Sequence, residues 1–345
     1  MREQHAVDLA TLTTLRLGGA ASTLVEVTSD DEFVAAVQAA DSAGEPVLVL
    51  GGGSNVVVSD DGFHGTVILV RTRGVDVDSD ACSGATVTVA AGEEWDPFVE
   101  RAVREHWVGV EALSGIPGLA GAVPIQNVGA YGQEVASTIA SVRTYDRAER
   151  RQHTFAAGDC GFSYRNSRFK ADPDRYAVLS VTFQFELADM SAPVRYAELA
   201  RRLGIEQGER AKASEVREAV LGLRRGKGMV LDEHDHDTWS AGSFFTNPIL
   251  TADDAARLPD DAPRFDQPDG RVKTSAAWLI DHAGFGKGYG EGAVGLSTKH
   301  ALALTNRGGA STAELLDLAR EVRDGVRAAY GITLHNEPVL VGAEL

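Results

Sequence analysis

The segment from Ser114 to Gly132, SGIPGLAGAVPIQNVGAYG, constrains the fold of this chain more than any other feature. It combines several glycines and two prolines with small and apolar residues, and it contains no charged side chain. A surface linker would carry Ser, Lys or Glu, and a core helix would lack the Pro and Gly residues that break helices. Glycine lets main-chain N–H groups reach a ligand without an intervening Cβ. The segment therefore predicts a backbone that lies against a bound molecule.

A second glycine-rich stretch, LGGGSNVVV, follows an apolar run that is typical of a buried strand. Its GGGSN turn is not the GxGxxG of dinucleotide-binding folds, and strand-like residues follow it in place of a helix. Ser54 and Asn55 suit hydrogen bonds to phosphate oxygens beside main-chain N–H groups. Either stretch alone could be a simple turn, but the two together predict a cofactor with a diphosphate.

Composition excludes several classes of protein. A chain of 345 residues with 43% hydrophobic residues can form two or three domains. Its net charge of -17 argues against a nucleic-acid groove or an anionic membrane as partner. Cys82 and Cys160 lack the spacing of a metal site and indicate a reducing compartment without disulfides. The N-terminal residues have no signal-peptide core and no apolar run is long enough to cross a bilayer, so we expect a cytoplasmic protein.

Apolar periodicity predicts an α/β part, a β-rich part and an α+β part. A capping box at Ser311 and Glu314 begins a long helix that ends at Gly331. We find no internal repeat, and the predicted domains are 1–72, 73–212 and 213–345. The predicted strands are 23–27, 46–50, 66–70, 85–90, 139–145, 176–187 and 337–341, and the predicted helices are 30–43, 95–106, one opening at Ser214, 275–283 and 311–331.

Three residues are candidates for chemistry. Arg165 lies between Phe162 and Phe169, which suggests a half-buried guanidinium that binds a carboxylate, although a surface ion pair is the alternative. Glu337 precedes an apolar strand, so it is either paired with a cation or has a raised pKa suited to proton transfer. Ser243 in AGSFF is either a functional hydroxyl or a turn or cap.

Weaker candidates are Lys227 and Tyr196, which could hold a charged substrate but could equally be surface residues. The tract DEHDHD at 232–237 suggests a metal site. Polar residues without apolar periodicity are more typical of a solvated loop, so we predict no metal.

Taken together, the motifs LGGGSN, IPGLAGAVPIQNVGAYG, YRNSRFK, GSFFTNP, WLIDHAGFGKG and NEPV make the chain resemble the UDP-N-acetylenolpyruvoylglucosamine reductases, the MurB family. They occur in the expected order over nearly the whole chain. PIQNVGAYG and VRYAEL resemble most the type with an inserted, tyrosine-bearing segment.

The resemblance implies an α+β fold with a two-part FAD-binding domain of the vanillyl-alcohol-oxidase (PCMH) type and a C-terminal α+β substrate-binding domain. It implies non-covalent FAD, NADPH as co-substrate and reduction of the enolpyruvyl group of a UDP-N-acetylglucosamine substrate to UDP-N-acetylmuramate for peptidoglycan synthesis, by a protein that we expect to be a monomer. It places Arg165, Ser243 and Glu337 in catalysis, with Ser243 as proton donor. It assigns substrate binding to Tyr164, Tyr196, Lys227 and Asn247, and FAD binding to Gly51, Gly52, Gly53, Ser54, Asn55, Ile116, Pro117, Gly118, Ala122, Val123, Gln126, Asn127, Gly129, Ala130 and Tyr131.

The chain departs from the family pattern at two positions. Thr246 stands where many relatives have Lys, and Asn166 replaces a common Asp. Two other functions remain open: a flavin oxidase on the same scaffold, which often links its flavin through a His, and a non-enzymatic nucleotide-binding regulator. His64 and His106 do not directly follow a glycine-rich turn, and the regulator leaves the three candidate catalytic residues without a role.

Overall fold

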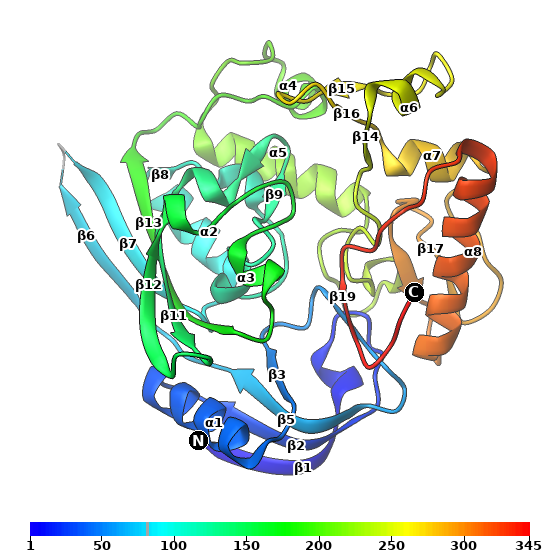
Figure 1. Cartoon of the computed structure of the whole chain (residues 1–345). Coiled ribbons are helices and arrows are strands. Elements are labelled where there is room, and N and C mark those ends of the chain that lie inside the picture. Colours follow the sequence, from blue (N-terminus) through cyan, green and yellow to red (C-terminus); the bar gives the residue numbers. More distant parts are fainter. Residues whose placement is uncertain (81–82) are drawn as a thin grey trace. The chain divides into compact units, whose positions relative to one another are not determined.

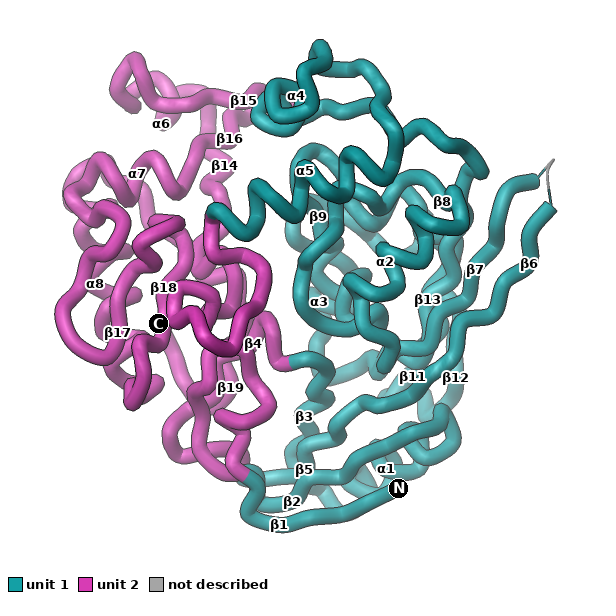
Figure 2. Tube along the Cα trace, turned by 180° about the vertical axis from the view of Figure 1, so that it is seen from behind, with its two compact units in different colours: residues 1–7, 21–52, 64–226 teal, residues 8–20, 53–63, 227–345 magenta. Residues whose placement is uncertain are grey.

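The computed structural model describes residues 1–80 and 83–345, so Cys82 lies outside the described residues. The chain divides into two units, shown in different colours in Figure 2. Unit 1 comprises residues 1–7, 21–52 and 64–226, and unit 2 comprises residues 8–20, 53–63 and 227–345. Among the described residues, no helix combines the length and the apolarity needed to traverse a bilayer.

Unit 1 contains two main sheets. The first has the strand order β1-β2-β5-β3, and the second has the order β12-β11-β13-β7-β6 with β8 paired to β13. β3 and β5 are parallel, whereas β13 is antiparallel to both of its neighbours β11 and β7. The strands are β1 (Arg2–Asp8), β2 (Ala20–Val27), β3 (Val47–Leu50), β5 (Phe63–Val70), β6 (Val75–Asp80), β7 (Gly84–Ala90), β8 (Trp107–Val108), β9 (Gly129–Ala130), β10 (Gln133–Glu134), β11 (Ile139–Asp146), β12 (Arg151–Ala156) and β13 (Tyr176–Leu187).

The helices of unit 1 pack on the sheets and on one another, and their places are labelled in Figure 1. These helices are α1 (Asp30–Ala43), α2 (Trp95–Arg104), α3 (Arg168–Ala171), α4 (Ala197–Leu203) and α5 (Ala213–Gly226), and α4 lies against α5. Phe33 of α1 belongs to a buried cluster that also includes Ile68 of β5 and Leu179 of β13, so α1 contributes to a core shared by the two sheets. A second core, around Trp95 and Phe183, joins α2 to the long strand β13.

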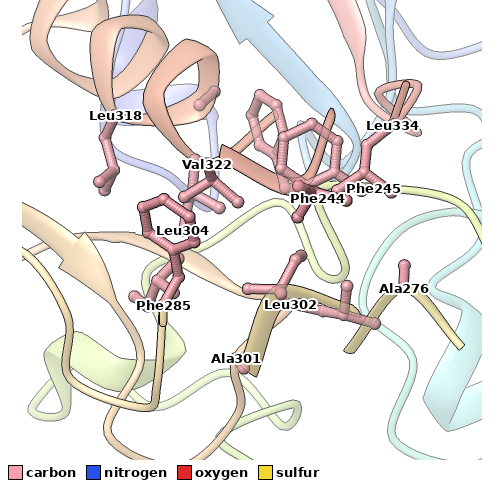
Figure 3. Packing of buried hydrophobic residues seen from close by; sticks show 14 of the residues in the cluster. Phe244, Phe245, Ala276, Phe285, Ala301, Leu302, Leu304, Leu318, Val322 and Leu334 are labelled. Carbon is pink, nitrogen blue, oxygen red and sulfur yellow. The ribbon is translucent and has the colours of Figure 1, made fainter. Parts of the chain in front are cut away.

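Unit 2 is built around one long helix, α8 (Thr312–Tyr330). The Ser311–Glu314 capping box begins this helix, and Gly331 ends it with a positive φ of 70°. Its buried face packs on Phe244, Phe245 and Phe285 in the cluster of Figure 3. The other elements are β4 (Val56–Val58), β14 (Ile249–Leu250), α6 (Ala252–Ala256), β15 (Phe265–Asp266), β16 (Val272–Lys273), α7 (Ala276–His282), β17 (Val294–Leu296), β18 (Leu304–Asn306) and β19 (Val339–Val341).

The sequence predicted the strongly periodic elements well. Helix 30–43 and strand 176–187 have the predicted bounds, and no helix follows the GGGSN turn, as expected. The prediction missed β1, β6 and β12 because most of their residues are exposed and polar. It also missed the helix α4, which lies in the stretch 190–208 where only the end of the strands was predicted.

Cys160 is a core residue and not a reactive thiol. Its side chain is fully buried in the core around Trp95. Burial raises the pKa of the thiol to about 11, although the positive charge of Arg168 opposes this shift. The thiolate is therefore scarce at neutral pH.

Candidate functional site

The two glycine-rich stretches meet within unit 1. A Cβ on Gly52 would lie only 2.9 Å from the Cα of Gly118, and a Cβ on Gly51 would lie 3.4 Å from the Leu119 side chain. The first distance is too short for any real side chain, so Gly52 is required by this backbone approach. The sequence predicted that each stretch lies against a bound molecule, and it gave no sign that the two stretches contact each other. These two glycine-rich stretches fit a ligand that is held mainly by main-chain N–H groups.

The first half of the segment 114–132 is anchored by the start of α2. The N–H of Trp95 donates to the carbonyl of Gly118 at 3.0 Å, and the N–H of Gly115 donates to Asp96 Oδ1 at 2.6 Å. Arg217 of α5 donates to both carboxylate oxygens of Asp96, at 2.7 and 3.1 Å. Burial by itself would raise the pKa of Asp96, but the hydrogen bonds from Arg217 and Gly115 outweigh it and hold that pKa below its ordinary value.

We expect Asp96→Asn to destabilise the protein in a pH-dependent way. The folded pKa of Asp96 is lowered, so the stabilisation is present above the unfolded pKa near 3.8 and is lost as pH falls through the folded pKa. At neutral pH the loss should be about 1–3 kcal/mol, because Arg217 is left without a charged partner. The measurement is the thermal unfolding midpoint of wild type and variant from neutral pH to about pH 3. The two midpoints should converge in acid. A difference independent of pH would contradict the lowered pKa of Asp96. The control is Asp172→Asn, a change of the same kind at an exposed position.

The second half of the segment is held by residues of the run 161–170. Asn127 Nδ2 donates to the carbonyl of Ser163 at 3.0 Å, and Lys170 Nζ lies 3.3 Å from Gln126 Oε1. Asn127 and Tyr131 have positive φ values of 44° and 49°, which non-glycine residues seldom adopt. Such backbone strain clusters at functional sites.

Arg165 is half-buried in the same region, as its flanking phenylalanines predicted. Its Nη2 donates to the carbonyl of Gly129 at 2.7 Å, and its guanidinium carbon lies 5.3 Å from the centre of the Tyr164 ring. Lys170 Nζ donates to the carbonyl of Arg165 at 3.0 Å, and Arg165 itself has a positive φ of 54°. The predicted cofactor segment therefore fixes the predicted carboxylate-binding side chain.

Tyr131 and Tyr196 come from different parts of the chain and contact each other. Their rings meet edge to face with centres 5.4 Å apart. Tyr196 remains 44% exposed and directly precedes α4. Residues predicted to contact the cofactor and the substrate are thus neighbours within unit 1.

In unit 2, main-chain hydrogen bonds bring together three segments that the sequence singled out. The N–H of Glu337 donates to the carbonyl of Phe244 at 2.8 Å, so Ser243 and Glu337 lie at the same end of an antiparallel pairing. The N–H of Val339 donates to the carbonyl of Asn55 at 3.0 Å, and β19 continues parallel to β4. The buried rings of Phe244 and Phe245 anchor this pairing in the core (Figure 3).

The GGGSN turn is also fixed from within unit 2. Gly53 has a φ of 62°, and a Cβ there would lie 2.0 Å from the carbonyl oxygen of Leu12. Ser54 and Asn55, which follow it, are half-buried. The remaining predicted cofactor residues of unit 1 differ in exposure: Val123, Gln126 and Asn127 are buried, Ile116, Pro117, Gly118, Gly129 and Ala130 are half-buried, and Ala122 is exposed.

Two predicted substrate residues of unit 2 have different surroundings. Asn247 Oδ1 accepts a hydrogen bond from the N–H of Ala276 at 2.9 Å, so this side chain also orients the start of α7. Lys227 is half-buried just beyond α5. In the acidic tract, Asp235 pairs with Lys299, and Asp237 Oδ1 accepts from the N–H of Thr298 at 2.8 Å.

Sequence reasoning missed the residues that position the glycine-rich segment. These are Asp96, Glu111, Gln133 and Arg217. Asp96 and Arg217 look like ordinary charges on amphipathic helices, and their pairing depends on tertiary structure. Glu111 carried a usable signal, because it is a lone carboxylate in the otherwise uncharged run WVGVEALSG.

Comparison with known proteins gives matches over the whole chain. Residues 21–154 match an FAD binding domain, and residues 233–341 match the C-terminal domain of UDP-N-acetylenolpyruvoylglucosamine reductase. The chain is 61% identical over 342 residues to the UDP-N-acetylenolpyruvoylglucosamine reductase of Cutibacterium acnes, covering 98% of this chain and 90% of that protein. It is 58% identical to the protein of the same name from Streptomyces avermitilis, covering 100% and 96%. The crystal structure of the reductase MurB from Thermus caldophilus has a similar fold, with a TM-score of 0.67, 24% identity and 99% coverage of both chains.

Proposed function

The chain belongs to the UDP-N-acetylenolpyruvoylglucosamine reductase family, and we propose that it reduces the enolpyruvyl group of UDP-N-acetylglucosamine enolpyruvate to give UDP-N-acetylmuramate. It is an FAD-dependent oxidoreductase of peptidoglycan synthesis with NADPH as co-substrate. The fold is the α+β arrangement of an FAD-binding domain and a C-terminal domain that the sequence predicted. The assignment of roles to individual residues is part of the proposal.

One observation carries the assignment of the catalytic residues. Main-chain hydrogen bonds place Ser243 and Glu337 at one end of a pairing that also includes Asn55 of the GGGSN turn. The Ser243 hydroxyl, the Glu337 carboxyl group and the GGGSN turn therefore lie on segments that are joined by main-chain hydrogen bonds. Pre-organised groups of this kind lower the cost of reaching a transition state.

The two glycine-rich stretches would hold FAD, which when bound would supply hydride transfer from NADPH to the terminal vinyl carbon of the substrate. Negative charge then develops on the carbon that bears the substrate carboxylate and spreads into that group. Arg165 neutralises this charge, because a guanidinium binds a carboxylate with two parallel hydrogen bonds. Its tether to Gly129 holds the side chain in position before the charge appears.

Ser243 Oγ donates the proton that the carbanionic carbon takes up. A hydroxyl is a weak acid towards ordinary bases, but this carbon is an exceptionally strong base. Glu337 has one of two roles: protonated, it would donate a hydrogen bond to the substrate carboxylate, and ionised, it would pair with a cation. Tyr164, Tyr196, Lys227 and Asn247 bind the rest of the substrate or the nicotinamide donor. The negatively charged chain binds two anionic molecules, so local cations such as Lys227 must offset an unfavourable long-range field.

Anaerobic visible spectroscopy tests the proposed function. We expect the flavin band of the purified protein to bleach on addition of NADPH and to return on addition of enolpyruvyl-UDP-N-acetylglucosamine. A flavin that bleaches with NADPH but does not recover with this substrate would reject the substrate assignment. Rapid recovery with oxygen alone would indicate a flavin oxidase.

A further inference from the structure

Glu111 is a completely buried carboxylate at the junction of three loops of unit 1. It begins the short 3-10 helix Glu111–Leu113, immediately before the glycine-rich segment. Charged side chains are almost never fully buried unless hydrogen bonds or ion pairs compensate the loss of hydration. The proposed reaction gives Glu111 no role, so its burial needs another explanation.

The carboxylate accepts three hydrogen bonds from three separate places in the chain. Oε2 accepts from the N–H of Gly109 at 2.7 Å. Oε1 accepts from Gln133 Nε2 at 2.9 Å and from the N–H of Ala192 at 2.7 Å. Oε1 of Glu111 therefore joins Gln133, which directly follows the glycine-rich segment, to Ala192 in the segment 191–196.

Both of these connections continue to residues of the proposed site. Gln133 returns a second hydrogen bond, because its Oε1 accepts from the N–H of Ala112 at 2.8 Å, and it lies two residues after Tyr131. Ala192 lies four residues before Tyr196. Between them, the side chain of Val194 is buried in one hydrophobic cluster with Ala112. The rings of Tyr131 and Tyr196 contact each other edge to face, so the two connections from Glu111 end at neighbouring side chains.

We propose that Glu111 is a positioning residue that fixes the segment 191–196, and with it Tyr196, against the glycine-rich segment. Ideal acceptor geometry for two loops at once needs both lone pairs of one carboxylate oxygen. The role of Tyr196 in substrate binding rests on the proposed function. The prediction is that breaking the Ala192 connection weakens substrate binding and leaves FAD binding in place.

Two variants of the same residue separate the connections. In Glu111→Gln, the amide oxygen keeps Gln133 and Ala192 as donors when the new NH₂ group faces Gly109, so the N–H of Gly109 is the one that loses its acceptor. In Glu111→Gln/Gln133→Glu, the carboxylate at position 133 can only accept hydrogen bonds. The NH₂ group of the new amide at position 111 therefore turns towards position 133 and donates to that carboxylate. The N–H of Ala192 then faces another donor and loses its acceptor, while Gly109 and Ala112 keep theirs. The double variant has the same net charge as wild type.

We expect the KM for enolpyruvyl-UDP-N-acetylglucosamine to be about tenfold higher in the double variant than in Glu111→Gln, because the unsatisfied N–H moves from Gly109 to Ala192, the residue that leads to Tyr196. The FAD dissociation constants of the two variants, measured by fluorescence titration of the apoprotein, should agree within about threefold. Equal KM values, or an FAD affinity that falls in parallel with KM, would overturn the proposal. A merely structural residue would lower stability without separating the two affinities.

Hydrogen exchange tests the same link without any substrate. Peptides that cover residues 190–199 should exchange faster in the double variant than in Glu111→Gln, whereas peptides from residues 113–130 should be equally protected in both. Faster exchange in both regions, or in neither, would contradict the proposal. If wild-type flavin failed to recover with the substrate, the proposed function would fail, and the exchange result would still decide the role of Glu111.

Discussion

We expect Ser243→Ala to slow the recovery of the reduced flavin with substrate by about 10³-fold and to leave its reduction by NADPH within about threefold of wild type. In the proposed mechanism, Ser243 Oγ donates a proton only when the substrate is reduced, and no proton from this residue is needed when NADPH delivers electrons. The measurement is stopped-flow absorbance of the flavin band in each half-reaction separately.

Ser243→Cys is the matched variant for this prediction. A thiol is more acidic than a hydroxyl and keeps a transferable proton at the same position, so it should recover part of the rate. The pairing of Phe244 with Glu337 uses main-chain atoms and should persist in both variants. Equal losses in the two half-reactions of Ser243→Ala would assign Ser243 a structural role as a turn or cap.

We expect Gly52→Ala to weaken FAD binding by about 10- to 100-fold. The new Cβ would lie 2.9 Å from the backbone Cα of Gly118, and its position is fixed by the backbone of residue 52, so rotation of a side chain cannot relieve the contact. The two stretches must move apart, and their N–H groups can no longer reach one diphosphate together. The measurement is the FAD dissociation constant from fluorescence titration of the apoprotein.

Gly158→Ala is the control for Gly52→Ala. Gly158 is also in unit 1, its φ is not positive, and a Cβ there meets no atom within 4 Å. It should bind FAD like wild type. Unchanged FAD affinity in Gly52→Ala would show that the approach of the two stretches is not part of the cofactor site.

The sequence was most informative where a pattern is local and repeated. The helix 30–43 has an apolar stripe and an acidic first turn, and the strand 176–187 alternates polar and apolar residues from Ser180 onwards, so both were predicted with the observed bounds. The edge strand β6, VDVDSD, gave no such signal because four of its six residues are polar and exposed. Edge strands need one apolar face at most, and their pattern is correspondingly weak.

In the candidate site too, the parts that are continuous in sequence were predicted and the parts that depend on tertiary contacts were not. Glycine-rich turns and the motif around Arg165 are continuous in sequence, and they could be recognised before the structure was known. The supports of these motifs are discontinuous: Asp96 and Arg217 are joined only by the packing of α2 on α5. The sequence can predict the groups that act on a ligand, but the groups that hold them depend on tertiary contacts.

The pairing of β4 with β19 also bears on how the enzyme is made. Val56 and Val339 are partners in the register although almost the whole chain separates them, so closing this pair carries a large loss of chain entropy. During synthesis from the N-terminus, every strand of both unit 1 sheets leaves the ribosome before the partner of β4 has been translated. The hydrogen bonds that join Asn55, Phe244 and Glu337 are therefore completed only after β19 emerges, and under the proposed roles of Ser243 and Glu337 a nascent chain is inactive until then.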